Sequence, residues 1–227
     1  MMTLDRISSD PVLAAPLEIV PFKKRKRIFD ILFSLTALLL GLPFFIVIAF
    51  LIKLSSKGPV FYCSLRLGHK GQLFKFWKFR SMHCDADSRL QHLLKQQPKL
   101  NREWQRFFKL RNDPRLTYLG RLIRKTSLDE LPQFWNVLKG DLSIVGPRPY
   151  LPREEKRIKE LIGSNIDVLF SIKPGLTGIW QTSGRSALSF EKRVALDLSY
   201  VQTHSFLLDM QLIAKTIPEM IASKGAF

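Results

Sequence analysis

Cysteine and acidic residues are both scarce in this chain, and each scarcity excludes a class of protein. Only two cysteines, Cys63 and Cys84, occur among 227 residues. They lack the paired spacing that zinc sites and disulfide frameworks need, so a reduced cytoplasmic setting is the simpler expectation. Asp and Glu total 19 against 36 Lys and Arg, which gives a net charge of +17. Such a field favours anionic partners: lipid headgroups, nucleotides or nucleic acid.

The N-terminal region lacks the features of a cleavable signal peptide. Residues 1–22 show no sustained hydrophobic period, and we expect them to form a disordered leader. The apolar run begins only after the basic cluster Lys23–Arg27, is longer than a signal-peptide core, and has no small-residue cleavage site. This run therefore belongs to the mature protein.

The apolar run Ile28–Ile52 predicts a membrane segment. Its 25 residues suffice to cross a hydrocarbon core of about 30 Å as one helix. Two features favour re-entry instead. Pro43 removes a helical hydrogen bond near the middle, and basic residues flank both ends, whereas a spanning helix biases them to one side. A helix broken at Pro43 has two arms that are each too short to cross. On these residues alone, a single span and a re-entrant helix-break-helix both stay open.

Beyond residue 57 the pattern changes to the alternation that is typical of strands. Val60–Tyr62 and Arg66–Arg80 predict a hairpin around His69-Lys70-Gly71. Residues 99–111 mix aromatic and basic side chains as an amphipathic helix does. This helix could pack on the core or lie on a membrane surface, and its charge favours the surface. Residues 206–221 predict a closing apolar helix. The predicted fold class is therefore α+β, with a membrane-inserted N-terminal helix.

The stretch Thr126–Pro149 holds the strongest candidate chemistry. Asp129 and Glu130 stand at the expected start of an apolar helix, where Ser127-x-x-Glu130 matches a capping box that explains the acids without catalysis. A helix N-terminus also keeps a carboxylate ionised and attracts phosphate, and Arg124 adds positive charge just upstream. On this second interpretation Asp129 is a nucleophile that attacks phosphorus.

Arg148 lies between two prolines, Pro147 and Pro149. Proline on each side restricts the backbone and favours an extended path. The guanidinium is therefore presented in a fixed direction, and its planar fork suits phosphate oxygens. We expect Arg148 to bind a phosphate group.

Three long motifs resemble those of a known family. Residues 125–133 (KTSLDELPQ), 138–149 (LKGDLSIVGPRP) and 173–181 (KPGLTGIWQ) are similar to the bacterial sugar transferases that act as monotopic phosphoglycosyl transferases. The resemblance extends from about Lys24 to the C-terminus, and it is strongest to the short exopolysaccharide-initiating members. It implies a re-entrant membrane helix over 23–57 and a compact cytoplasmic catalytic domain with interfacial amphipathic helices over 58–227, at the bacterial inner membrane. The chain departs from the family pattern at Leu42, where serine is usual, and at Lys173, where arginine is usual.

The resemblance also implies a reaction. A phospho-sugar would pass from a UDP-sugar to polyprenyl (undecaprenyl) phosphate through a covalent intermediate on Asp129, with release of UMP. Glu130 would orient Asp129 or accept a proton, and Mg²⁺ would be held by Asp129 together with substrate oxygens. Inner-membrane lipids are expected partners and nucleic acid is not; the oligomeric state stays open, with a dimer as one option. The implied substrate-binding residues are Lys78, Arg80, Arg124, Arg148, Lys173, Arg185 and Asp197.

Several alternatives stay open beside this reading. The main rival is a non-catalytic single-span membrane protein whose basic domain binds nucleic acid or anionic lipid; it predicts that Asp129 is dispensable. A hydrolase with Asp129 and Glu130 as an acid–base pair is weaker, because adjacent helical residues point about 100° apart. Asp197 is equally well explained as a helix-surface acid. Asp30 is either a helix-start acid that balances the basic cluster or, as the resemblance implies, a residue with a structural or active-site supporting role.

Overall fold

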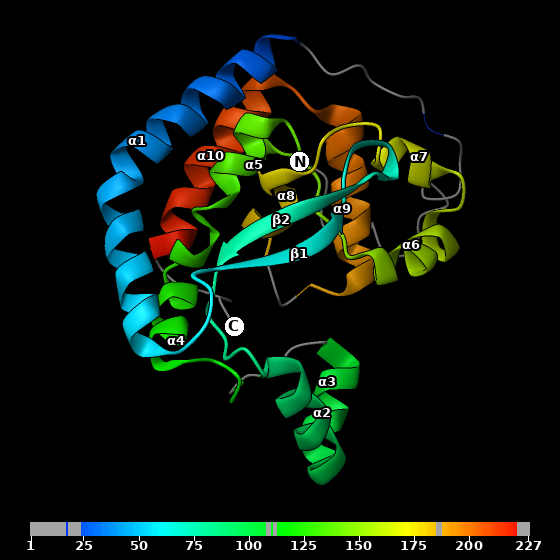
Figure 1. Ribbon diagram of the computed structural model, residues 1–227. Helices are drawn as coiled ribbons and strands as arrows, with labels where there is room; N and C mark the ends of the chain where they lie inside the picture. The colour runs from blue at the N-terminus through cyan, green and yellow to red at the C-terminus, as the bar shows by residue number, and fades with distance from the viewer. Residues whose placement is uncertain (1–16, 18–23, 108–109, 111–112, 185–187, 222–227) are drawn as a thin grey trace. The chain divides into compact units, whose positions relative to one another are not determined.

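The computed structural model describes residues 17, 24–107, 110, 113–184 and 188–221 (Figure 1). Nearly all of the expected leader, residues 1–22, lies outside the described residues, and so does Arg185. The chain forms two compact units, each with its own hydrophobic core. The first contains the described residues within 1–40, 63–76 and 133–225, and the second contains those within 41–62 and 77–132.

Helix α1 spans Lys24–Ser55 and continues without a break through Pro43. The break that we expected there is therefore wrong as secondary structure. Proline deletes only its own N–H, so one carbonyl of the preceding turn loses its partner while the other turns keep theirs. At about 1.5 Å per residue, the 32 residues of α1 measure about 48 Å, more than a hydrocarbon core of about 30 Å. By length and composition α1 is a helix that could cross a membrane, and only 11% of its most apolar window is buried in the protein.

The expected hairpin is present. Strand β1 (Phe61–Leu67) pairs with β2 (Leu73–Phe79) around a 3-10 turn at His69–Gly71. The turn needs left-handed backbone, which Gly71 adopts at low cost with a φ of 70° and which Lys70 shares with a φ of 56°. Figure 1 draws β1 and β2 as two neighbouring arrows, and at seven residues each they are the longest strands among the described residues.

The first unit is built around a short parallel pair of strands. Strand β3 (Ser143–Val145) pairs with β4 (Gly175–Thr177), with Ser143 opposite Gly175 and Val145 opposite Thr177. A Cβ on Gly175 would lie 2.1 Å from the Gly146 nitrogen, so only glycine permits this close approach. Gly175 therefore makes room for the neighbouring strand.

Helices cover this strand pair and supply most of the core. Helices α5 (Gln133–Lys139) and α10 (Phe206–Ile221) pack against the strands. Three residues of α9 (Phe190–Thr203) recur at the spacing of one helical face and are almost completely buried: Val194, Leu198 and Val201. The helical elements of this unit are α5 (Gln133–Lys139), a 3-10 turn at Pro152–Glu154, α6 (Glu155–Ile162), α7 (Asn165–Leu169), α8 (Ile179–Thr182), α9 (Phe190–Thr203) and α10 (Phe206–Ile221).

The second unit packs around Ile52, Phe79 and Ile123, which are at most 2% exposed. Helix α4 (Tyr118–Lys125) begins at Thr117, whose Oγ1 accepts a hydrogen bond from the Gly120 nitrogen at 2.8 Å. The other elements of this unit are α2 (Ala86–Gln96), α3 (Pro98–Phe107) and a 3-10 turn at Leu128–Glu130. Helix α3 confirms the helix expected within residues 99–111 as far as Phe107, and it packs against α2.

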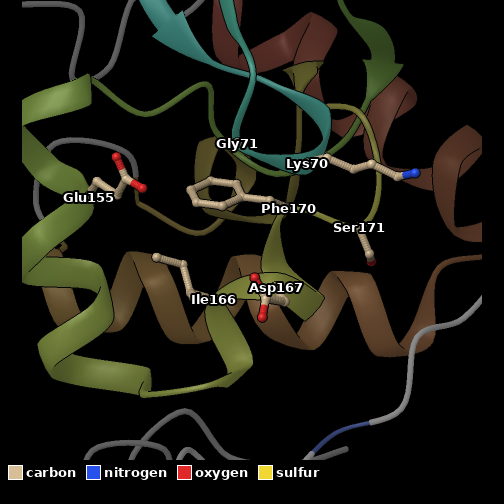
Figure 2. A pocket seen from close by; sticks show the side chains of 7 residues that line it. All are labelled: Lys70, Gly71, Glu155, Ile166, Asp167, Phe170 and Ser171. Atoms are coloured by element: carbon tan, nitrogen blue, oxygen red, sulfur yellow. The ribbon is translucent and has the colours of Figure 1, made fainter.

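A hollow of about 350 Å³ opens in the first unit (Figure 2). Its lining contains none of the catalytic, substrate-binding or metal-binding residues that the sequence predicted. In Figure 2 the Phe170 ring lies at its centre, with the Glu155 and Asp167 carboxylates on different sides of the ring. The lining residues are Lys70, Gly71, Glu155, Ile166, Asp167, Phe170 and Ser171.

Candidate active site

The two adjacent acids lie in a 3-10 turn that precedes α5, and they do not cap that helix. Ser127 has a left-handed backbone with a φ of 57°, and its side chain makes no capping hydrogen bond. Helix α5 begins only at Gln133. The expected capping box is therefore wrong, because Ser127 serves as the left-handed residue that follows the end of α4. The acids are free of a capping role.

Lys78 of β2 lies against both acids. Its Nζ is 2.5 Å from Oε1 of Glu130 and 3.7 Å from Oδ2 of Asp129. The Lys78 side chain is 23% exposed, Asp129 6% and Glu130 41%. The pair is therefore asymmetric: Asp129 is enclosed, whereas Glu130 reaches water and holds the lysine. The structure thus brings together three of the residues that the sequence selected.

The surroundings of Asp129 set its protonation. Burial raises the pKa of the Asp129 carboxyl, the Lys78 ammonium lowers it, and the Glu130 carboxylate raises it again. Arg124, in the last turn of α4, also lowers the pKa of Asp129, while its Nε donates a 2.9 Å hydrogen bond to Ser81 Oγ. A nucleophilic carboxylate must be ionised, so additional positive charge at this position would favour the reactive form.

Arg80 has a different environment from the one we expected. It is 6% exposed, and its guanidinium bonds to the carbonyls of Ser56 (2.8 Å) and Lys57 beyond the end of α1. Helix ends leave carbonyl groups without partners, and these bonds supply partners for the chain where α1 stops. The geometry gives Arg80 a structural role in place of the expected substrate contact.

Asp197 of α9 is also placed differently. It is fully buried, so it is neither a helix-surface acid nor a group that can reach a substrate directly. Its Oδ2 accepts hydrogen bonds from the Arg148 backbone nitrogen at 3.0 Å and from the Tyr150 hydroxyl at 2.6 Å. Burial raises the pKa of Asp197 to about 7, although Tyr150 and Arg148 lower it. Burial and the Asp197 charge raise the pKa of the Tyr150 phenol in turn.

Arg148 is held as rigidly as its flanking prolines predict. The carbonyl of Pro147 accepts from the Gly175 nitrogen at 2.8 Å, and the carbonyl of Pro149 accepts from Arg66 at 3.2 Å. The guanidinium carbon lies 5.3 Å from the centre of the Trp180 ring. This is the geometry of a cation over an aromatic face, so the side chain also has a preferred direction.

Lys173 shares its surroundings with Arg27, the last residue of the basic cluster. Burial lowers the pKa of Lys173, and the Arg27 guanidinium lowers it further. Arg27 donates to the carbonyls of Val137 and Leu138 at the end of α5, at 2.5 and 2.7 Å. Lys173 therefore keeps a half-buried cation beside a second cation, an arrangement that attracts an anion.

Sequence reasoning missed a buried ion pair at the start of α1. Lys26 Nζ lies 2.5 Å from Asp209 Oδ2 of α10, and the Tyr200 hydroxyl donates to Asp209 Oδ1 at 2.6 Å. Asp30 is fully buried one turn later and accepts from the Ile144 nitrogen at 3.1 Å. Asp30 thus supports β3 and is not a solvated helix-start acid. No local pattern signals partners that lie more than a hundred residues away.

Within the described residues, no group of three or more His, Cys, Asp and Glu side chains is arranged to hold a metal ion. Mg²⁺ does not need such a group, since it usually binds one or two carboxylates together with substrate phosphates and water. Asp129 and its neighbour Glu130 offer that number of carboxylates. The donor set therefore fits a Mg²⁺ ion that binds together with a phosphate substrate.

Comparison with known proteins defines the class. A family model described as bacterial sugar transferase matches residues 22–223, and the chain belongs to this family. The family indicated by the three motifs is thereby confirmed. The chain is an enzyme of the sugar-phosphate transferase class. The alternative hypothesis of a non-catalytic membrane protein with a basic binding domain is therefore rejected.

Individual relatives are similar over most of this chain. It is 45% identical over 202 residues to the exopolysaccharide production protein ExoY of Rhizobium meliloti and 44% identical over 202 residues to ExoY of Sinorhizobium fredii. Each match covers 89% of this chain and 88% of the relative. The undecaprenyl-phosphate galactose phosphotransferase of Salmonella typhimurium is 42% identical over 202 residues, which are 89% of this chain and 41% of that protein.

Proposed function

We propose that this protein transfers a sugar 1-phosphate from a UDP-sugar to polyprenyl phosphate, as the first membrane step of exopolysaccharide or other glycoconjugate synthesis. The observation that carries the proposal is the enclosed Asp129 carboxylate beside Lys78 and Glu130. The names of the relatives support the substrates, since one acts on undecaprenyl phosphate and two serve exopolysaccharide production.

The reaction has two displacements at one phosphorus atom. An Asp129 oxygen attacks the phosphorus that bears the sugar, the bond to the bridging oxygen of UMP breaks, and UMP leaves with that electron pair. A phosphate oxygen of the polyprenyl acceptor then attacks the same phosphorus. The bond to Asp129 breaks, the carboxylate is restored, and the product is a polyprenyl diphosphosugar. Each displacement forms one phosphorus–oxygen bond and breaks one.

The residues around Asp129 prepare it for attack. Lys78 favours the ionised carboxylate and offsets its repulsion from the donor phosphate, and Glu130 keeps Lys78 in place. Mg²⁺, held by Asp129 and substrate oxygens, supplies further positive charge when bound. Arg124, Arg148, Lys173 and Arg185 are assigned to phosphate binding, as the family resemblance implies. Burial excludes water that would otherwise hydrolyse the intermediate.

The membrane is part of this proposal, because the acceptor phosphate lies at the bilayer surface. Helix α1 inserts into the bacterial inner membrane, and the catalytic domain faces the cytoplasm. Basic residues lie at both ends of α1, at Arg25 and Lys53, so each end can contact anionic lipid headgroups. On α4, Tyr118 and Leu122 are 92% and 56% exposed one turn apart, as expected of a helix that rests on the interface.

The test uses the full-length protein in lipid nanodiscs with Mg²⁺, without acceptor lipid, and with a panel that includes UDP-galactose and UDP-glucose. Intact mass spectrometry should detect a phospho-sugar adduct on the wild type and on the matched control Asp87→Asn, an exposed acid of the same unit. The adduct should be absent from Asp129→Asn. An adduct that persists in Asp129→Asn refutes the nucleophile. Lipid-dependent turnover that survives this substitution, without an adduct on the wild type, would establish direct transfer instead.

A further inference from the structure

A fully buried carboxylate needs an explanation, because removing its charge from water is costly. Asp197 is 0% exposed and Tyr150 is 1% exposed. Only Oδ2 of Asp197 is hydrogen-bonded within the described residues, whereas Oδ1 is buried without a partner. Phe190 packs edge-on against the Tyr150 ring, with centroids 6.3 Å apart, and encloses the group further. An apolar residue of similar volume would fill the same space with equal or greater stability of the fold. The buried carboxylate of Asp197 is therefore not explained by packing alone.

The bonds of Asp197 converge on the peptide that carries Arg148. The flanking carbonyls of this peptide are already fixed by Gly175 and Arg66. The Arg148 nitrogen is the backbone donor between these two carbonyls, and Asp197 accepts its hydrogen bond. The Arg148 side chain is 18% exposed, and its Nη2 lies 3.7 Å from Oε1 of Glu154. Within the described part of the chain, this guanidinium donates no hydrogen bond that would occupy its fork.

We propose that Asp197, together with Tyr150, is a positioning residue that holds Arg148 in the conformation that binds phosphate, without touching the substrate. The proposal rests on the proposed function, in which Arg148 binds phosphate. A hydrogen bond to an ionised acceptor is shorter and stronger than one to a neutral acceptor. The Asp197 carboxylate therefore fixes the Arg148 backbone more firmly than a neutral side chain of the same shape.

The proposal predicts a dependence on pH near neutrality. The charged and titratable groups that face Asp197 are Tyr150 and Arg148 from the loop, Arg193 from α9 itself, and Glu154 through its contact with Arg148. Because burial raises the pKa of Asp197 to about 7, the carboxylate becomes protonated just below neutral pH. The binding of the UDP-sugar should therefore weaken as the pH falls through about 7. This effect belongs to Asp197 and is distinct from any titration of the nucleophile Asp129.

The decisive comparison is Asp197→Asn, Tyr150→Phe and the exposed control Glu160→Gln, each as the full-length protein in nanodiscs. We expect the KM for the UDP-sugar to rise on the order of tenfold in Asp197→Asn, as for loss of a hydrogen bond to a charged group. The turnover number at saturating donor should change much less. Tyr150→Phe keeps the bond to Arg148 and should show a smaller rise, and Glu160→Gln should match the wild type.

The pH profile separates positioning from a merely structural role. The wild-type KM should rise below about pH 7, and this rise should be missing from Asp197→Asn. An unchanged KM in Asp197→Asn, or a variant profile that keeps the wild-type pH dependence, overturns the proposal. If Asp197→Asn does not fold, Tyr150→Phe decides by the same KM criterion. A wild type that forms no adduct with any donor refutes the proposed function itself, whereas a normal adduct with an unchanged KM refutes only the positioning role.

Discussion

Replacing Asp197 by asparagine should stabilise the folded protein at neutral and higher pH even as it weakens donor binding. The pKa of this carboxyl rises from 3.8 in the unfolded chain to about 7 in the fold. The folded state therefore retains the proton over a range in which the unfolded state has released it. The stability contribution is fully present below about pH 4, is lost as the pH rises to about 7, and is constant above that. Asparagine does not ionise and has no such loss.

The magnitude follows from the shift. About three pKa units at 1.36 kcal/mol per unit amount to about 4 kcal/mol. For a chain of this size that corresponds to a difference in melting temperature of about 10 °C. The assay is thermal unfolding of both proteins in detergent micelles from about pH 4 to about pH 8. Only the difference between the two proteins is interpreted, because the titration of every other group is common to both. A difference that stays constant across this range would refute the reasoning.

Three further substitutions test other contacts. Lys78→Met should raise the pKa of Asp129 further, so the fall of the transfer rate at acidic pH should begin at a higher pH. Lys78→Arg keeps the positive charge and should show the wild-type pH profile. An unshifted profile in Lys78→Met would contradict the electrostatic role of Lys78. Arg80→Lys should lower the free energy of unfolding by about 1–3 kcal/mol, because hydrogen bonds to the carbonyls of Ser56 and Lys57 are lost. The KM for the UDP-sugar should not change. A raised KM would support the substrate contact that the family resemblance implied. Lys26→Met should leave the Asp209 carboxylate buried without its cation and cost about 3–5 kcal/mol in chemical denaturation, while the double variant with Asp209→Asn should recover part of that loss.

Local patterns in the sequence predicted the parts of the protein whose causes are local. The alternation in residues 66–80 correctly predicted the hairpin of β1 and β2. The prolines on each side of Arg148 correctly predicted that the loop carrying this residue is fixed. Motif order indicated the family and the acidic pair. The conformation of Ser127 was not predictable, because this residue both follows the end of α4 and precedes the 3-10 turn at Leu128–Glu130. The continuation of α1 through Pro43 was also not predictable, because the hydrogen bonds of the other helical turns outweigh the one that proline removes.

The roles of buried charges were not predictable, because their partners are distant in the sequence. Asp197 meets Tyr150 across 47 residues, and Lys26 meets Asp209 across 183. An isolated acid in a helical pattern is compatible with a surface position, a ligand position or a buried bond. Only the folded chain shows which one applies. The same holds for Arg80, whose motif context indicated substrate and whose contacts are the carbonyls that follow α1.

The polar bonds at the start of α1 bear on attempts to obtain a soluble enzyme. In many membrane-anchored enzymes the hydrophobic helix is a tether that can be cut away. Here Arg27 satisfies two carbonyls at the end of α5, and Asp30 satisfies the amide of Ile144 in β3. A truncated chain that starts after α1 would expose these groups and leave Asp209 without its lysine. The start of α1 is therefore part of the fold of the first unit, and a soluble version would have to retain the first two turns of this helix.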